Sequence, residues 1–171
     1  ALPETMRASL RVLSVILGQL EEQIGALDAE IIRRARDDET ARRLMTIPGI
    51  GPLIATALAT LAPPPAMFSK GRDFAAWLGL TPRQHSTGGK QRLGATTKMG
   101  ERSLRRLRII GANSVVQWRA RKGAMAGTWL AGMLARKPPM LVRVALANKM
   151  ARIVWALMTK GGTYRAPAAT T

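Results

Sequence analysis

The stretch Ile47-Pro48-Gly49-Ile50-Gly51-Pro52 separates two short segments in a chain of 171 residues. Residues 40–46 and 53–61 each carry helix-forming residues, and proline and glycine between them interrupt helical structure. The pattern predicts a helix, a tight turn and a second helix over residues 40–62. Alanines in the second segment keep that helix slim, so that the two helices can pack closely.

This unit has the features of a helix-hairpin-helix that binds nucleic acid. Glycine adopts positive φ without strain, so Gly49 and Gly51 are both expected to do so and to turn backbone amides outward. Amides at a helix N-terminus are suited to holding a phosphate. Gly49, Ile50 and Gly51 are therefore predicted nucleic-acid contacts. A Pro-Gly turn is also common between helices that bind nothing, and the spacing alone leaves that alternative open.

A heptad pattern precedes this unit. Its apolar residues are spaced alternately by four and three positions: Met6, Leu10, Leu13, Leu17, Leu20, Ile24, Leu27 and Ile31. Such a seam predicts a coiled-coil helix over residues 1–39 that joins copies of the chain into a homodimer or tetramer. Val12, Val15 and Ile16 widen the apolar face, which leaves packing within one chain as the alternative. Both interpretations make this helix an assembly element.

Charge is distributed unevenly along the chain, whose formal net charge is +17. Residues 1–40 hold five Arg against eight acids, whereas residues 41–171 hold 22 Lys or Arg against only Asp73 and Glu101. A net +20 over the second segment predicts a nucleic-acid partner, with a membrane surface as the rival. Prolines interrupt the uncharged run at 46–69, so no membrane span is expected. We expect a soluble, cytoplasmic protein.

The rest of the chain is expected to be mainly α. Residues 81–100 are polar, basic and glycine-rich, which predicts an active-site loop or a glycine-bent hairpin. Helices are expected within residues 101–160, and residues 166–171 are expected to form a frayed tail. Residues 40–165 would then form one small helical domain that carries the hairpin unit and the basic loop.

Few catalytic chemistries suit this composition. Two carboxylates after residue 40 cannot build a two-metal nuclease site, so no cofactor is expected in this chain. The single histidine, His85, and the absence of cysteine exclude histidine-rich and cysteine metal sites. A P-loop fails because glutamine stands at positions 84 and 91, where that motif needs glycine and Ser or Thr.

A hydroxyl among cations remains. Ser86 could attack a phosphodiester to give a phosphoserine that conserves the bond energy for rejoining. Surrounding cations would stabilise the charge that develops on phosphorus and are predicted to bind nucleic acid: Arg83, Lys90, Arg92, Lys98, Arg102 and Arg105. Ser86 and Thr87 could instead only hydrogen-bond phosphates or cap a turn. In that case the domain would be a noncatalytic, architectural DNA- or RNA-binding module.

Three motifs resemble a known family: the residues 47–52 turn, the stretch Leu78-Gly79-Leu80-Thr81-Pro82-Arg83-Gln84-His85-Ser86-Thr87-Gly88-Gly89-Lys90, and Lys98-Met99-Gly100 with Leu104-Arg105-Arg106. The helix around residues 147–152 fits too. Together they resemble the C-terminal coiled-coil and transposase domain of the bridge-RNA-guided insertion-sequence transposases, insertion-sequence family one hundred and ten.

The resemblance implies a function for the protein of which this domain is part. Members carry an N-terminal RuvC-like DEDD domain whose carboxylates hold Mg²⁺ and act with a serine of the C-terminal domain. The nucleophile carries over to Ser86, with Thr87 one place nearer the Gly-Gly-Lys as the alternative. The chain is then expected to be a C-terminal fragment, inactive alone. The whole protein would cut and rejoin DNA in transposition, with DNA and a guide RNA as partners.

Overall fold

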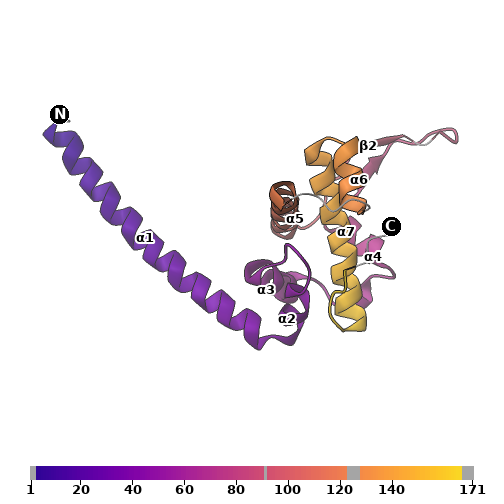
Figure 1. The fold of residues 1–171 in the computed structure, drawn as a ribbon, viewed down its shortest axis with the longest axis horizontal. Coiled ribbons are helices and arrows are strands. Elements are labelled where there is room, and N and C mark those ends of the chain that lie inside the picture. The colour runs from indigo at the N-terminus through magenta and orange to yellow at the C-terminus, as the bar shows by residue number, and fades with distance from the viewer. Residues whose placement is uncertain (1–2, 91, 123–127, 167–171) are drawn as a thin grey trace.

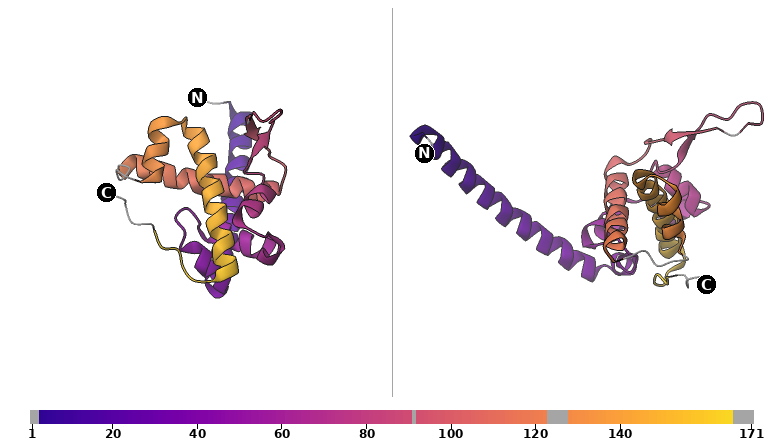
Figure 2. Two further views of the ribbon diagram at one scale, coloured as in Figure 1. Left: turned by 90° about the vertical axis from the view of Figure 1, so that its right-hand side faces the viewer. Right: turned by 45° about the horizontal axis from the view of Figure 1, so that its top comes forward.

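The computed structural model describes residues 3–90, 92–122 and 128–166, and it is mainly helical, as predicted. A single long helix projects from a compact helical body, and a β-hairpin projects from the body in the opposite direction (Figures 1 and 2). The predicted frayed tail lies almost wholly outside the described residues, as does the glycine-containing segment 123–127. No helix of the described part is long and apolar enough to cross a membrane.

The long helix, α1 (Glu4–Asp37), bears the predicted heptad seam. Most of the seam is exposed: Met6, Leu10, Leu13, Leu17, Leu20, Ile24 and Leu27 all have exposed fractions of 49–64%. Only Ala35, near its C-terminal end, is buried, where α1 meets the body. The described residues of this chain therefore leave this part of the seam uncovered.

The two predicted helices with a tight turn between them are present as α2 (Glu39–Met45) and α3 (Pro52–Leu61). Asp38 separates α1 from α2 and caps α2, because its carboxylate accepts a hydrogen bond from the Ala41 amide at 2.6 Å. Between α2 and α3, Ile50 N–H bonds to Ile47 O at 3.0 Å. With proline second and positive-φ glycine third, residues 47–50 have the composition and bond of a type II turn.

A short connecting region leads to the hairpin. The 3₁₀ turn η1 (Pro65–Met67) is followed by α4 (Gly71–Trp77), and Gly79, two residues after the end of α4, has φ +68°. The strands β1 (Pro82–Gln84) and β2 (Leu93–Thr96) then pair antiparallel. Of the two forms expected for residues 81–100, the glycine-bent hairpin is the one observed.

Three further helices complete the body: α5 (Arg102–Lys122), α6 (Trp129–Arg136) and α7 (Pro139–Lys160). Helix α7 is the hub, since α4, α5 and α6 all pack against it. The core lies between these helices and α2 and α3, and its largest fully buried apolar side chains include Phe74, Leu44, Leu58 and Leu104. The basic hairpin therefore projects from a packed helical body (Figure 1).

Candidate functional site

The tip of the hairpin is formed by the Gly-Gly pair. Gly88 and Gly89 have φ values of +57° and +76°, and Thr87 bridges to Lys90 across the turn. Both glycines therefore have a structural reason to be glycine, because side chains rarely adopt these angles. A Cβ at either position would meet no atom within 4 Å, so the tip is open to an approaching ligand.

Ser86 lies just before this tip, exposed and with its hydroxyl oriented. Its Oγ accepts a hydrogen bond from the Arg92 amide at 3.1 Å and donates one to Gln84 Oε1 at 3.3 Å. The amide would stabilise negative charge that develops on Oγ as its proton leaves. The bond from the Arg92 amide also links the two arms of the hairpin, which is what a turn-capping serine would do.

The predicted cations lie along the hairpin and at its base. Five of them are exposed: Arg83, Lys90, Arg92, Lys98 and Arg102. Arg105 is half-buried instead, and its guanidinium donates to Lys98 O at 2.8 Å and to Gly100 O at 3.4 Å. Arg105 thus fixes the segment that leads from β2 into α5, in addition to any contact with a ligand.

His85 occupies a different position from Ser86 on the strand. A Cβ at Gly94 would lie 2.6 Å from the His85 ring, so the ring covers the Gly94 backbone on the opposite strand. Neighbouring side chains of a strand point to opposite faces, which separates this ring from the Ser86 hydroxyl. The His85 ring is therefore occupied by packing on Gly94.

The three predicted contacts in the α2–α3 turn differ in what they can offer a ligand. Gly49 has the expected positive φ, +82°, whereas Gly51 has φ −89° and is extended, so the prediction for Gly51 was wrong. Its extended form arises because it caps α3 directly before Pro52. The Ile50 side chain is 4% exposed and belongs to the core, so only its backbone can meet a ligand.

The turn is held against α5 by glycine on both sides. A Cβ on Gly49 would lie 2.5 Å from Gly111 O, and a Cβ on Gly111 would overlap Gly49 O. The close approach of two backbones explains why both residues lack a side chain. Gly51 is not packed in this way, because a Cβ there would meet no atom within 4 Å. The N-terminus of α3, which follows it, has no side-chain cap.

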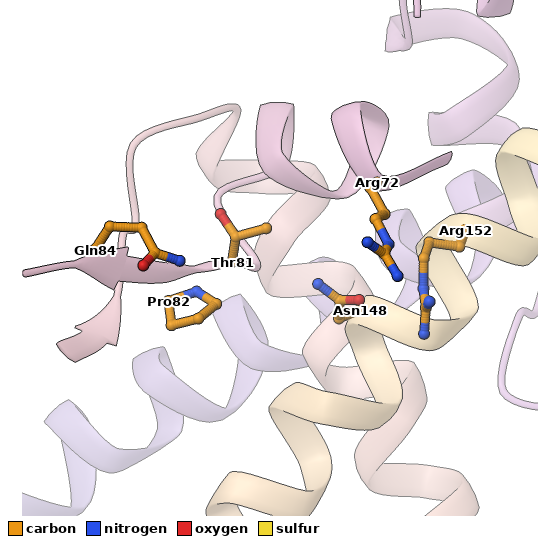
Figure 3. Close-up of a pocket in the computed structure, with 6 residues that line it drawn as sticks. All are labelled: Arg72, Thr81, Pro82, Gln84, Asn148 and Arg152. Atoms are coloured by element: carbon orange, nitrogen blue, oxygen red, sulfur yellow. The ribbon is translucent and has the colours of Figure 1, made fainter. Parts of the chain in front are cut away.

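A polar pocket of about 360 Å³ lies at the foot of the hairpin (Figure 3). Its lining comes from α4, from β1 with the residue before it, and from α7: Arg72, Thr81, Pro82, Gln84, Asn148 and Arg152. Asn148 Nδ2 donates to Leu80 O at 3.1 Å and so ties α7 to the start of the hairpin. Sequence reasoning missed these site residues. Asn148 and Arg152 are four apart on one helix face, which was a usable signal.

A second, larger hollow of about 790 Å³ lies between α5, α6, α7 and the α2–α3 turn. Two half-exposed tryptophans, Trp118 and Trp129, line it. Lys149 Nζ lies 4.6 Å from the Trp129 ring centroid, and Arg119 lies 4.8 Å from that of Trp118. These aromatic faces already contact cations of the same chain.

Arg108 is an unexpected feature of α5. Its side chain is fully buried, and its three guanidinium nitrogens have no hydrogen-bond partner among the described residues. Burial lowers the pKa of the Arg108 guanidinium to about 9. The sequence contained a signal for this burial, since Leu104, Arg108 and Ala112 are spaced by four on one helix face.

The structure gives no cluster in this chain that would hold the metal implied by the resemblance. Among the described residues, no three His, Cys, Asp or Glu side chains come together in a group that could bind an ion. Glu101 is used otherwise, because its Oε2 accepts the Leu104 amide at 2.5 Å, which lowers the pKa of its carboxyl. The residues present do not fit a Mg²⁺ site.

Comparison with known proteins gives consistent results. Residues 41–125 match the family model described as "Transposase IS116/IS110/IS902 family". The chain is 51% identical over 148 residues to a putative transposase of Sinorhizobium fredii, covering 86% of this chain and 38% of the relative. It is 48% identical over 164 residues to a probable family 20 transposase of Pseudomonas aeruginosa, covering 96% and 48% of the two chains.

A third relative is the transposase for insertion sequence element IS1328 of Yersinia enterocolitica. It is 42% identical over 147 residues, which cover 86% of this chain and 44% of the relative. The chain thus spans less than half the length of each of these curated relatives. The matched region contains the α2–α3 turn, the hairpin with Ser86 and α5. Through residues 41–125, the chain is similar to the IS116/IS110/IS902 transposase family.

Proposed function

We propose that this chain is the DNA-binding and serine-nucleophile domain of a transposase that cleaves and rejoins DNA strands. The observation that carries the proposal is the Ser86 hydroxyl, exposed on a basic hairpin and held between the Arg92 amide and Gln84 Oε1. Its position in a region matched by a transposase family model supports a role in strand cleavage. In the complete protein, a guide RNA would select the DNA, and Mg²⁺ would be held by a DEDD domain outside this chain.

The proposed step forms a bond from Ser86 Oγ to the phosphorus of a DNA phosphodiester. The bond from phosphorus to one deoxyribose oxygen breaks, and the leaving oxygen takes up the proton that the serine loses. The phosphoserine ester retains the energy needed for a new deoxyribose hydroxyl to attack and rejoin the strand. Cations of the hairpin, Arg83, Lys90 and Arg92 among them, would stabilise the additional negative charge of the transition state.

Two further groups would position the DNA. The first N–H groups of α3 after Pro52 have no side-chain cap and would bind a backbone phosphate. Lys98 and Arg102 lie where the hairpin joins α5 and would contact the same nucleic acid. Arg105 would act mainly by fixing this junction, through its bonds to Lys98 O and Gly100 O.

The nucleophile is tested with the complete protein, its guide RNA and labelled DNA. A covalent protein–DNA adduct is expected on a denaturing gel, and Ser86→Ala should reduce it by at least about a thousandfold, because no other group replaces a nucleophile. The matched control, Thr87→Ala, removes the neighbouring hydroxyl and should leave the adduct in place. Loss of the adduct with Thr87→Ala alone would move the nucleophile to Thr87.

An absence of any adduct would favour the noncatalytic, architectural function instead. One observation gives that alternative its basis, because the hydrogen bond from the Arg92 amide to Ser86 Oγ also links the two arms of the hairpin. In that case Ser86→Ala would lower the stability of the hairpin and the affinity for DNA by similar, small amounts. The adduct and the binding measurement together separate the two functions.

Assembly through α1 is the remaining part of the proposal. Its exposed seam would pair with the α1 of another copy, because burying seven large apolar side chains is favourable and nothing described in this chain covers them. Light scattering should give a dimer or tetramer for the chain and a monomer for residues 40–171. Leu17→Asp with Leu20→Asp should have the effect of the deletion. A monomeric mass for the intact chain at micromolar concentration would contradict this assembly.

A further inference from the structure

Two arginines that are 80 positions apart in sequence are brought together in the pocket at the foot of the hairpin. Arg72 is the second residue of α4 and Arg152 belongs to α7, and both side chains lie at the same end of the pocket (Figure 3). Gly71 allows this approach, since a Cβ there would lie 3.2 Å from Arg152 Cα and from Arg152 O. The close packing of α4 on α7 therefore determines the arginine pair.

No carboxylate balances the two guanidiniums. Every ion pair found among the described residues lies in α1 or α2, and neither Arg72 nor Arg152 takes part in one. After residue 40 the sequence has only two acids, and Glu101 is bonded to the Leu104 amide. Asp73 follows Arg72 in α4 but forms no ion pair among the described residues. Two adjacent unpaired cations favour binding of an anion.

The other residues of the pocket suit an anion with several oxygens. Thr81 supplies a hydroxyl, and Asn148 and Gln84 supply amide groups that can donate hydrogen bonds. The planar, forked guanidinium matches the geometry of phosphate oxygens. Gln84 also joins the pocket to the reactive end of the hairpin, because its Oε1 accepts the hydrogen bond from Ser86 Oγ.

We propose that the pocket of Arg72, Arg152, Asn148, Thr81 and Gln84 binds a phosphodiester of the same DNA strand that approaches Ser86. This inference rests on the proposed function and adds to it a second anchoring point for the substrate. Gln84 and Ser86 point to the same face of β1 and its extension, since alternate residues of a strand share a face. A DNA strand that runs along this face could contact both the pocket and the Ser86 hydroxyl.

The test is equilibrium binding of the chain to fluorescein-labelled DNA of about 20 nucleotides, measured by anisotropy between about 50 and 200 mM salt. Arg72→Gln and Arg152→Gln keep much of the side-chain stems but remove the charges, and together they should weaken binding about tenfold or more. The slope of log affinity against log salt should fall by about 0.7 to 0.9 for each phosphate that the variant no longer neutralises. Circular dichroism confirms that each variant keeps its helical content.

The control pair, Lys160→Gln with Arg165→Gln, removes the same charge from exposed positions at and after the C-terminal end of α7. It should change affinity by less than about threefold, because general electrostatic attraction is spread over many cations. Equal losses of affinity for the two pairs would overturn the pocket. So would pocket variants that bind RNA of the same sequence more weakly but bind DNA as before. The measurement needs no cleavage, so it stands or fails independently of the adduct at Ser86.

Discussion

Gly111→Ala is expected to destabilise the chain by about 3 kcal/mol or more, because the new methyl group would overlap a backbone carbonyl. The Cβ would run into Gly49 O and would also lie 3.0 Å from Ile54 Cδ1. A flexible side chain could move aside, but Gly49 belongs to a tight turn whose backbone is held by its own hydrogen bond. Relief requires α5 to move away from the α2–α3 turn.

Urea unfolding followed by circular dichroism measures this effect, and Gly132→Ala is the matched control. Gly132 also lies within a helix, α6, and a Cβ there would meet only Arg136 Nη2, at 3.8 Å. Alanine favours a helix by up to about 1 kcal/mol over glycine, so the control should be neutral or stabilising. If Gly111→Ala were as stable as the control, the close contact between the turn and α5 would be refuted.

Arg108→Met is expected to stabilise the chain by about 2–5 kcal/mol at pH 7. The Arg108 guanidinium is fully buried and without a partner among the described residues, whereas methionine fills a similar volume without a charge. Burial lowers the pKa of Arg108 to about 9, and a shift of this size corresponds to roughly 5 kcal/mol. Thermal or urea unfolding of both proteins at pH 7 gives the difference directly.

The pH dependence of this difference has a definite sign. Because the pKa of Arg108 is lower in the folded than in the unfolded chain, the unfolded chain binds more protons above pH 9. The penalty is complete below pH 9 and diminishes as the pH rises beyond it. The advantage of Arg108→Met should therefore shrink between pH 9 and pH 11, with the other titrating groups common to both proteins.

A lower stability for Arg108→Met would show that the guanidinium has a favourable partner in solution. Arg108→Lys separates charge from shape, because lysine retains a cation that can lose its proton more easily when buried. It should be less stable than Arg108→Met at pH 7 and should approach it at pH 11. A constant gap between these variants would contradict a penalty that originates in burial of charge.

Local patterns were sufficient for much of the fold. The heptad spacing predicted α1, and the Ile47–Pro52 stretch predicted the α2–turn–α3 unit with positive φ at Gly49. Both are local properties, since helical periodicity and turn chemistry involve residues only a few positions apart. The same reasoning failed at Gly51, because its role as helix cap before Pro52 required an extended backbone.

The candidate site was only partly accessible in this way. Ser86 and the basic hairpin residues stood out by composition, and the structure shows the Ser86 hydroxyl exposed and hydrogen-bonded. Arg105 appeared to be one more surface cation, yet its guanidinium bonds to backbone carbonyls of the segment before α5. Whether an arginine is exposed to solvent or bonds to the backbone depends on the position of its guanidinium at the end of a long flexible side chain. The pattern of charges along the sequence does not give that position.

The sequence alone determined that this chain is mainly helical, is strongly basic after residue 40 and carries a hydroxyl in a basic, glycine-rich segment. Only the tertiary structure decided that Gly49 meets Gly111, that Arg108 is buried unpaired and that Arg72 lies beside Arg152. The physical reason is the sequence separation of the interacting residues. Periodicity and turn preferences act between near neighbours, whereas these contacts join residues about 60 to 80 positions apart and arise from how α4, α5 and α7 pack.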